Sequence, residues 1–201
     1  MNAKGVLISV MCIALVAMIA GAGTLAYFSD TETSTGNTFT AGTLNLKVDD
    51  QDGVNIVKFM VTDIKPGDSG VGTWKLTNAG SLDGYIDLEN ILVTDDENLN
   101  PESETDTTEP GDLSANMDVV LFWDDGAGGG TAGNGVQDGS EAIIYSGKLR
   151  NIASSYNESY FLASGNTTYV SMTWSVAGTV GNDIQGDKVT LNITFELAQT
   201  P

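Results

Sequence analysis

A glycine-rich stretch in the middle of the chain holds the residue types best suited to binding a metal ion. It supplies five oxygen-bearing side chains, Asp124, Asp125, Asn134, Asp138 and Glu141. Calcium takes six to eight oxygen ligands from carboxylates, amides and carbonyls, so a loop that folds back on itself is a candidate calcium site. The spacing differs from that of an EF-hand loop, and a solvated loop without metal is the alternative interpretation. We predict that the protein requires no cofactor, and calcium is the one candidate for a bound metal ion.

Most catalytic chemistry is excluded by two absences. The chain has no histidine, and its single cysteine, Cys12, lies near the N-terminus. Protein zinc sites are built mainly from His and Cys, and the usual Ser and Cys nucleophiles are activated by a His base. A hydrolytic zinc site made of carboxylates alone would be very unusual. The sequence therefore predicts a protein that is not an enzyme.

The N-terminus has the layout of a secretory signal peptide. Lys4 provides a positive end, residues 6–20 are an apolar run with Ser9 as its one polar residue, and Thr24 and Ala26 are small residues at the positions a signal peptidase reads. We predict a helical signal peptide at residues 1–26, cut between Ala26 and Tyr27. A retained membrane anchor is the alternative, because about 20 apolar residues span a bilayer.

The chain beyond the predicted cleavage point is strongly acidic. All 27 acidic residues and seven of the eight basic ones follow Ala26, so the exported part carries a net charge of −20. Such a surface repels nucleic acid and anionic membranes. Eight of the acidic residues fall within 95–112, which we predict to be a solvated loop or a locally disordered insert.

The remaining chain is composed of strands and turns. Apolar residues alternate with polar ones most clearly at 170–176 and 189–197, the spacing of half-buried strands. Other predicted strands are 42–49, 54–62, 71–78, 85–94, 117–123, 142–149 and 156–162, with a helical turn at 150–155. Trp74, Trp123 and Trp174 lie in these patterns and are assigned to the core, with a sugar-binding platform as the alternative. The fold class is all-β, a single antiparallel β-sandwich of jelly-roll or immunoglobulin-like type at residues 42–201.

Three blocks of sequence resemble the TasA/camelysin family of secreted fibre proteins, which includes archaeal members that resemble bundling pilins. The first, 24–46, contains TFTAGTLNL; the second, 64–82, contains IKPGD and NAGSL; the third is the closing strand at 188–199. The resemblance implies a jelly-roll subunit, exported by a dedicated signal peptidase, in an extracellular filament of a biofilm matrix or pilus. Although a metallopeptidase label originates in this family, this sequence lacks His-Glu-x-x-His.

The resemblance also implies donor-strand complementation, in which the N-terminal strand of each subunit completes the sheet of its neighbour. Residues 27–41 would form the donor arm, and its β-prone side chains are Tyr27, Phe28, Thr31, Thr33 and Thr35. The expected partners are further copies of the chain, joined head to tail, with accessory filament subunits. A frayed N-terminus is the alternative for the arm. A monomeric or anchored cell-surface adhesin or surface-layer module is the alternative function.

Three sequons of the form Asn-x-Ser/Thr occur, at Asn157, Asn166 and Asn192. Each is a candidate glycosylation site on an exported protein. Asn192 lies between two residues assigned to the core, so its side chain should face solvent.

Overall fold

The structure is a computed structural model that describes residues 2, 4, 42–53, 64–97 and 110–200. The chain divides into two units, Met1–Thr40 and Ala41–Pro201, and all the strands below belong to the second. The predicted cleavage site, the donor arm and the predicted strand at 54–62 lie outside the described residues. Within the described residues, no helix has the length and apolar character needed to cross a membrane.

Eight strands account for nearly all the regular structure of the described residues. They are β1 (Leu46–Val48), β2 (Ser69–Asn78), β3 (Gly84–Asp96), β4 (Met117–Trp123), β5 (Ile143–Lys148), β6 (Tyr156–Leu162), β7 (Thr167–Val176) and β8 (Lys188–Ala198). One short helix, α2 (Leu113–Asn116), and three 3-10 turns, η1 (Ala127–Gly129), η2 (Leu149–Asn151) and η3 (Asn182–Ile184), lie between them. The turn at η2 overlaps the start of the helical turn predicted at 150–155.

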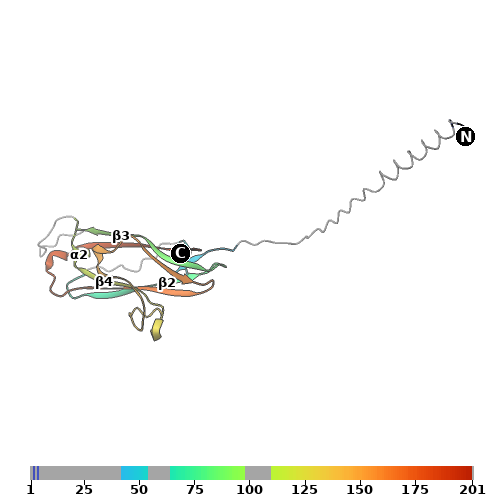
Figure 1. The fold of residues 1–201 in the computed structure, drawn as a ribbon. Coiled ribbons are helices and arrows are strands. Elements are labelled where there is room, and N and C mark those ends of the chain that lie inside the picture. The colour runs from blue at the N-terminus through green and yellow to red at the C-terminus, as the bar shows by residue number, and fades with distance from the viewer. Residues whose placement is uncertain (1, 3, 5–41, 54–63, 98–109, 201) are drawn as a thin grey trace. The chain divides into compact units, whose positions relative to one another are not determined.

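The strands form two sheets. One has the order β1-β2-β7-β4-β5 and the other the order β6-β3-β8. All pairings between these strands are antiparallel, which confirms the predicted all-β antiparallel fold. Figure 1 shows β3 in one layer and β2 and β4 in the other. The jelly-roll connectivity stays a prediction.

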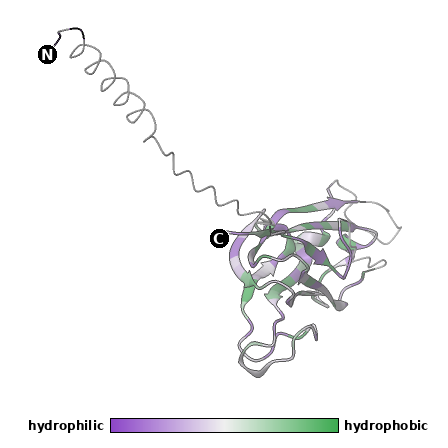
Figure 2. Cartoon of the chain, turned by 90° about the vertical axis from the view of Figure 1, so that its right-hand side faces the viewer, coloured by the Kyte–Doolittle hydropathy of each residue, from purple (hydrophilic) through white to green (hydrophobic). Residues whose placement is uncertain are grey.

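The core lies between the two sheets and is built from alternate residues of their strands. Fully buried examples are Leu76 on β2, Ile86 and Leu88 on β3, Leu121 on β4 and Val170 on β7. Figure 2 shows hydrophobic and hydrophilic segments following one another along the strands of this unit. Trp74, Trp123 and Trp174 are only 6%, 2% and 6% exposed, so their assignment to the core is confirmed.

The strand β3 is longer than the sequence pattern predicts and contains a bulge. Its pairing with β8 shifts register between Glu89 and Leu92, and Asn90 has a φ of 50°. A bulge adds one residue to one strand and changes which side chains face inward. Ile91 therefore joins the core, whereas Leu92 is 57% exposed on the outer face.

The predicted solvated loop at 95–112 is wrong at its first residues. Asp95 and Asp96 belong to β3, and the Glu97 side chain is 4% exposed. The short helix α2 provides the reason, because the Ser114 N–H donates to the Asp95 carboxylate at 2.9 Å and the Ser114 hydroxyl donates to its other oxygen. A carboxylate with such donors is stabilised away from bulk water.

Candidate functional site

One side of the sandwich is closed by aromatic side chains. The edge strands β5 and β6 meet there through Tyr145 and Tyr156, with ring centroids 6.2 Å apart. Further in, Trp123 of β4 stacks on Tyr160 of β6 at 4.0 Å. Stacked rings at this separation pack tightly and exclude water. These contacts join the two sheets on this side.

The opposite side of the sandwich is bordered by β8 and β2. Trp74 of β2 contacts Phe195 of β8 edge to face, with centroids 5.7 Å apart, so these strands face each other across the core. Of the ten residues of β2, only the last three pair with β1. The short edge strand leaves most of β2 without a second neighbour among the described strands.

The strand β8 is the candidate assembly edge. It spans 11 residues, and among the described strands its one neighbour is β3. Its inward-facing side chains, Val189, Leu191, Ile193, Phe195 and Leu197, pack against the core but are only half-buried. The inward-facing residues of β7 are by contrast buried. Within the described residues, β8 thus has a free edge and incompletely covered apolar side chains, the features of a template for adding a strand.

Residues 42–45, which lead from the predicted donor arm into β1, are held by the turn at 78–82. The Ala79 N–H donates to the Asn45 carbonyl at 2.7 Å, and the Ser81 and Leu82 N–H groups donate to the Thr43 carbonyl at 2.8 and 3.2 Å. These residues were predicted as strand from their alternation, but they pair with a turn. Parts of two blocks that carry the family resemblance, GTLNL at 42–46 and NAGSL at 78–82, thus meet in space.

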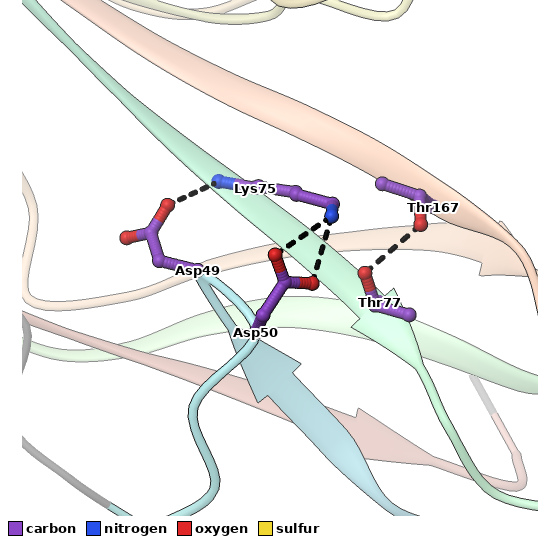
Figure 3. Close-up of polar contacts among 5 residues, drawn as sticks. All are labelled: Asp49, Asp50, Lys75, Thr77 and Thr167. Atoms are coloured by element: carbon purple, nitrogen blue, oxygen red, sulfur yellow. Dashed lines mark hydrogen bonds and ion pairs between the residues drawn. The ribbon is translucent and has the colours of Figure 1, made fainter.

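The far end of β1 is fixed by a second turn. Asp49 and Asp50 both have positive φ, and the Asp50 carboxylate forms an ion pair with Lys75 of β2 at 2.7 Å. Figure 3 shows this pair beside the bond from the Lys75 N–H to Asp49, and the bond between Thr77 and Thr167 further along β2. The hydrogen bond that the Lys75 ammonium donates to the Asp50 carboxylate raises the pKa of Lys75. These contacts hold β1 at one register on β2.

The predicted calcium ligands lie together in one loop, but their oxygens bind backbone N–H groups. Asp124 is fully buried, and its carboxylate accepts the Gly133 and Gly135 N–H groups at 2.7 Å and the Ser171 hydroxyl at 2.7 Å. Several glycines of the loop have positive φ, which lets successive N–H groups converge on one carboxylate. Asp124 therefore organises the loop over the outer face of the five-stranded sheet.

The other predicted ligands have similar partners. Asp125 accepts the Ala127 N–H and the Tyr160 hydroxyl, and Glu141, 3% exposed, accepts the Gly126 and Asp138 N–H groups. Asp138 in turn accepts the Thr131 N–H and the Asn134 amide. In the part of the chain that the structure describes, no three acidic side chains are placed to share a metal ion. Calcium binding stays a prediction.

Chelation tests the calcium prediction directly. Because the loop carboxylates already accept N–H groups, we expect EDTA to leave the urea midpoint of unfolding unchanged. If the folded state binds calcium, a free calcium concentration of about a hundred times the Kd would add about 2.7 kcal/mol to the free energy of unfolding. Unfolding followed by tryptophan fluorescence, with EDTA and with added calcium, distinguishes the two. A midpoint that rises with calcium would establish the site.

Acidic side chains also gather around the start of α2. The Asp187 carboxylate accepts the Asp112 N–H and is hydrogen-bonded to the Glu97 side chain. Burial raises the pKa of Asp187, and the negative charge of Asp112 adds to the rise, while the hydrogen bonds from the Asp112 and Leu113 backbone and from Glu97 oppose it.

This arrangement predicts a pH-dependent effect of Asp187→Asn. A raised folded-state pKa gives a contribution to stability that is fully present below the ordinary Asp value of about 3.9 and is lost as the pH rises through the folded value. The variant is neutral at every pH, so its stability relative to wild type should increase as the pH rises over that window. Urea unfolding across the window measures this, with the exposed Asp183→Asn on η3 as the matched control. A difference independent of pH would contradict the prediction.

The three sequons lie on the surface. Asn157 on β6, Asn166 before β7 and Asn192 on β8 are all exposed. The side chain of Asn192 lies on the outer face, as the strand alternation predicted. Their glycosylation stays a prediction.

Comparison with known proteins gives one family. A family model described as camelysin metallo-endopeptidase matches residues 3–201. A search of curated proteins finds no match to this chain.

Proposed function

The chain belongs to the TasA/camelysin family, and on this basis we propose that it is a secreted structural subunit of an extracellular filament. The all-β fold, the acidic surface and the predicted export leader agree with such a role. Its place of action is the cell surface or a biofilm matrix.

A structural role fits the residues better than the peptidase activity in the family description. The sequence has no histidine, and its only cysteine lies in the predicted leader. The acidic side chains that the loop brings together already accept N–H groups. These residues do not fit a hydrolytic zinc centre, which needs ligands free to bind the metal and an open position for water.

The half-buried face of β8 is the observation that carries the filament proposal. An added strand beside β8 would pair with its backbone and cover Leu191, Ile193 and Phe195, each of which is half-buried. Burying apolar surface contributes about 25 cal/mol per Å². We propose that the strand is the 27–41 arm of a second copy. Each copy then offers one arm and one edge, so the contact propagates without closing.

Removal of the arm tests this proposal. The exported wild type should begin at Tyr27 in N-terminal sequencing and form fibres above a threshold concentration, seen by negative-stain microscopy. Deleting 27–38 should abolish the fibres and leave a folded monomer. Thr33→Pro should act in the same way, because proline removes a ladder donor, whereas the matched Thr33→Val should retain assembly.

Two outcomes would contradict the proposal. Fibres that form without the arm would exclude donor-strand assembly. A wild type that stays monomeric with an uncut leader would instead favour an anchored cell-surface module.

A further inference from the structure

Two glycines lie where residues 42–45 contact the turn at 78–82, and neither position has free space for a side chain. A Cβ placed on Gly80 would overlap the Thr43 carbonyl oxygen and lie 2.8 Å from the Asn45 nitrogen. A Cβ on Gly42 would overlap the Leu82 side chain. Neither glycine has a positive φ, so the restriction is one of space: at Gly80 a side chain would meet backbone, and at Gly42 it would displace the Leu82 side chain. The two backbones therefore touch directly.

The turn is itself anchored to the core of the sandwich. Asn78 is fully buried, its amide donates to the Leu82 and Leu162 carbonyls at 2.8 and 3.1 Å, and its oxygen accepts the Gly80 N–H at 3.1 Å. On the other side of the contact, the Ser81 hydroxyl accepts the Thr43 N–H at 2.9 Å. The residues that precede β1 are thus held by backbone and side-chain bonds to a rigid support.

We propose that the turn at 78–82 is a clamp that presents the arm for donation, with Gly80 as its positioning residue. This inference rests on the proposed filament function. An arm that starts from a fixed point loses less conformational freedom on entering a neighbour than one that starts from a loose segment. Ordering even one backbone residue changes an equilibrium about tenfold, and the clamp holds residues 42–45 in advance.

The clamp affects how a subunit donates its own arm and not how it accepts the arm of another copy. Its bonds involve residues 42–45 and 78–82, whereas the proposed acceptor edge is β8. A subunit with a broken clamp should therefore still receive the arm of another copy. In a head-to-tail chain, such a subunit ends the growth of the filament that it joins.

The test uses Gly80→Ala in the full exported chain. Its control is Gly178→Ala, since a Cβ at Gly178 meets nothing within 4 Å and its φ is not positive. We expect the critical concentration for fibre formation to rise roughly tenfold or more for Gly80→Ala and to stay unchanged for the control. Added in small proportion to the wild type, Gly80→Ala should shorten the fibres.

A second variant guards against a simple folding defect. Ser81→Ala removes only the hydroxyl that accepts the Thr43 N–H, so it should fold as the wild type and raise the critical concentration by a smaller factor. Shortened fibres from substoichiometric Gly80→Ala would support the clamp, because an unfolded chain cannot join a fibre end.

Three results would overturn the inference. Gly80→Ala and Ser81→Ala could both assemble like the wild type, which would show that the turn does not position the arm. Gly80→Ala could neither assemble nor shorten wild-type fibres while Ser81→Ala is normal, which would assign the turn to folding alone. A wild type without fibres would refute the proposed function, and the clamp with it.

Discussion

Replacing Asp124 by alanine is expected to lower the free energy of unfolding by about 3–5 kcal/mol. The substitution leaves the buried Gly135 N–H without its acceptor. It also removes the carboxylate bonds of the Gly133 N–H and the Ser171 hydroxyl, which keep only their second partners, the Asp124 carbonyl and Thr73. Each buried donor that loses its partner costs about 1–3 kcal/mol. Since domains of this size are stable by about 5–15 kcal/mol, the change removes a large share of the total.

Urea unfolding measures this loss, and a double-mutant cycle with Ser171→Ala separates its parts. Asp124→Ala should cost about 1 kcal/mol less in the Ser171→Ala background, because one donor is already absent. Asp124→Asn keeps the size of the side chain and one acceptor oxygen, so its cost should be intermediate. A loss below about 1 kcal/mol for Asp124→Ala would mean that the loop is not coupled to the sandwich.

Asn78→Asp is expected to be as disruptive, with a marked dependence on pH. The Asn78 amide nitrogen donates to two carbonyl oxygens, and a carboxylate oxygen in its place would face both of them without a proton. The cost should be about 3–5 kcal/mol at neutral pH. Below the ordinary Asp value of about 3.9, the protonated group can donate again to one carbonyl, and part of the loss should be recovered.

The pH dependence distinguishes electrostatic repulsion from a packing defect. In a folded state that raises the carboxyl pKa, the stability of the variant falls as the pH rises through the folded value. Asn78→Ala, which removes the same bonds without adding a charge, should lose about 2–4 kcal/mol at every pH. If the free energy of unfolding of the two variants changed with pH in the same way, repulsion between the carboxylate and the two carbonyls would not be the cause of the lost stability.

The sequence pattern located most strands, because the alternation of apolar and polar residues shows which side chains of a strand are buried. The strands β7 and β8 begin and end within a few residues of the predicted 170–176 and 189–197. The pattern could not place α2, since four residues carry no helical period. It also extended β1 to residue 42, because alternation cannot show that the turn at 78–82, and not a strand, pairs with residues 43–45.

The candidate site was harder to predict than the fold. The residue types around Asp124 indicated a polar centre, but the sequence does not show which donors a folded loop presents to a carboxylate. Glycines with positive φ at 133 and 135 turn their N–H groups toward Asp124, and the Gly126 N–H meets Glu141 in the same way. Asn78 was overlooked for a similar reason, since only the fold brings the Leu162 carbonyl to its amide.

In the proposed filament, the antiparallel pairing of β1 with β2 would have a mechanical consequence under tension. A pull on the arm enters the subunit at Gly42 and runs along β1, so the bonds from Ala79 and Ser81 and the β1–β2 ladder are loaded together in shear. Bonds loaded together resist rupture better than bonds that open one at a time. The Asp50–Lys75 ion pair lies at the far end of the same path, and Asn78 passes the load to β6. The shortest of the described strands would thus bear the traction between neighbouring subunits.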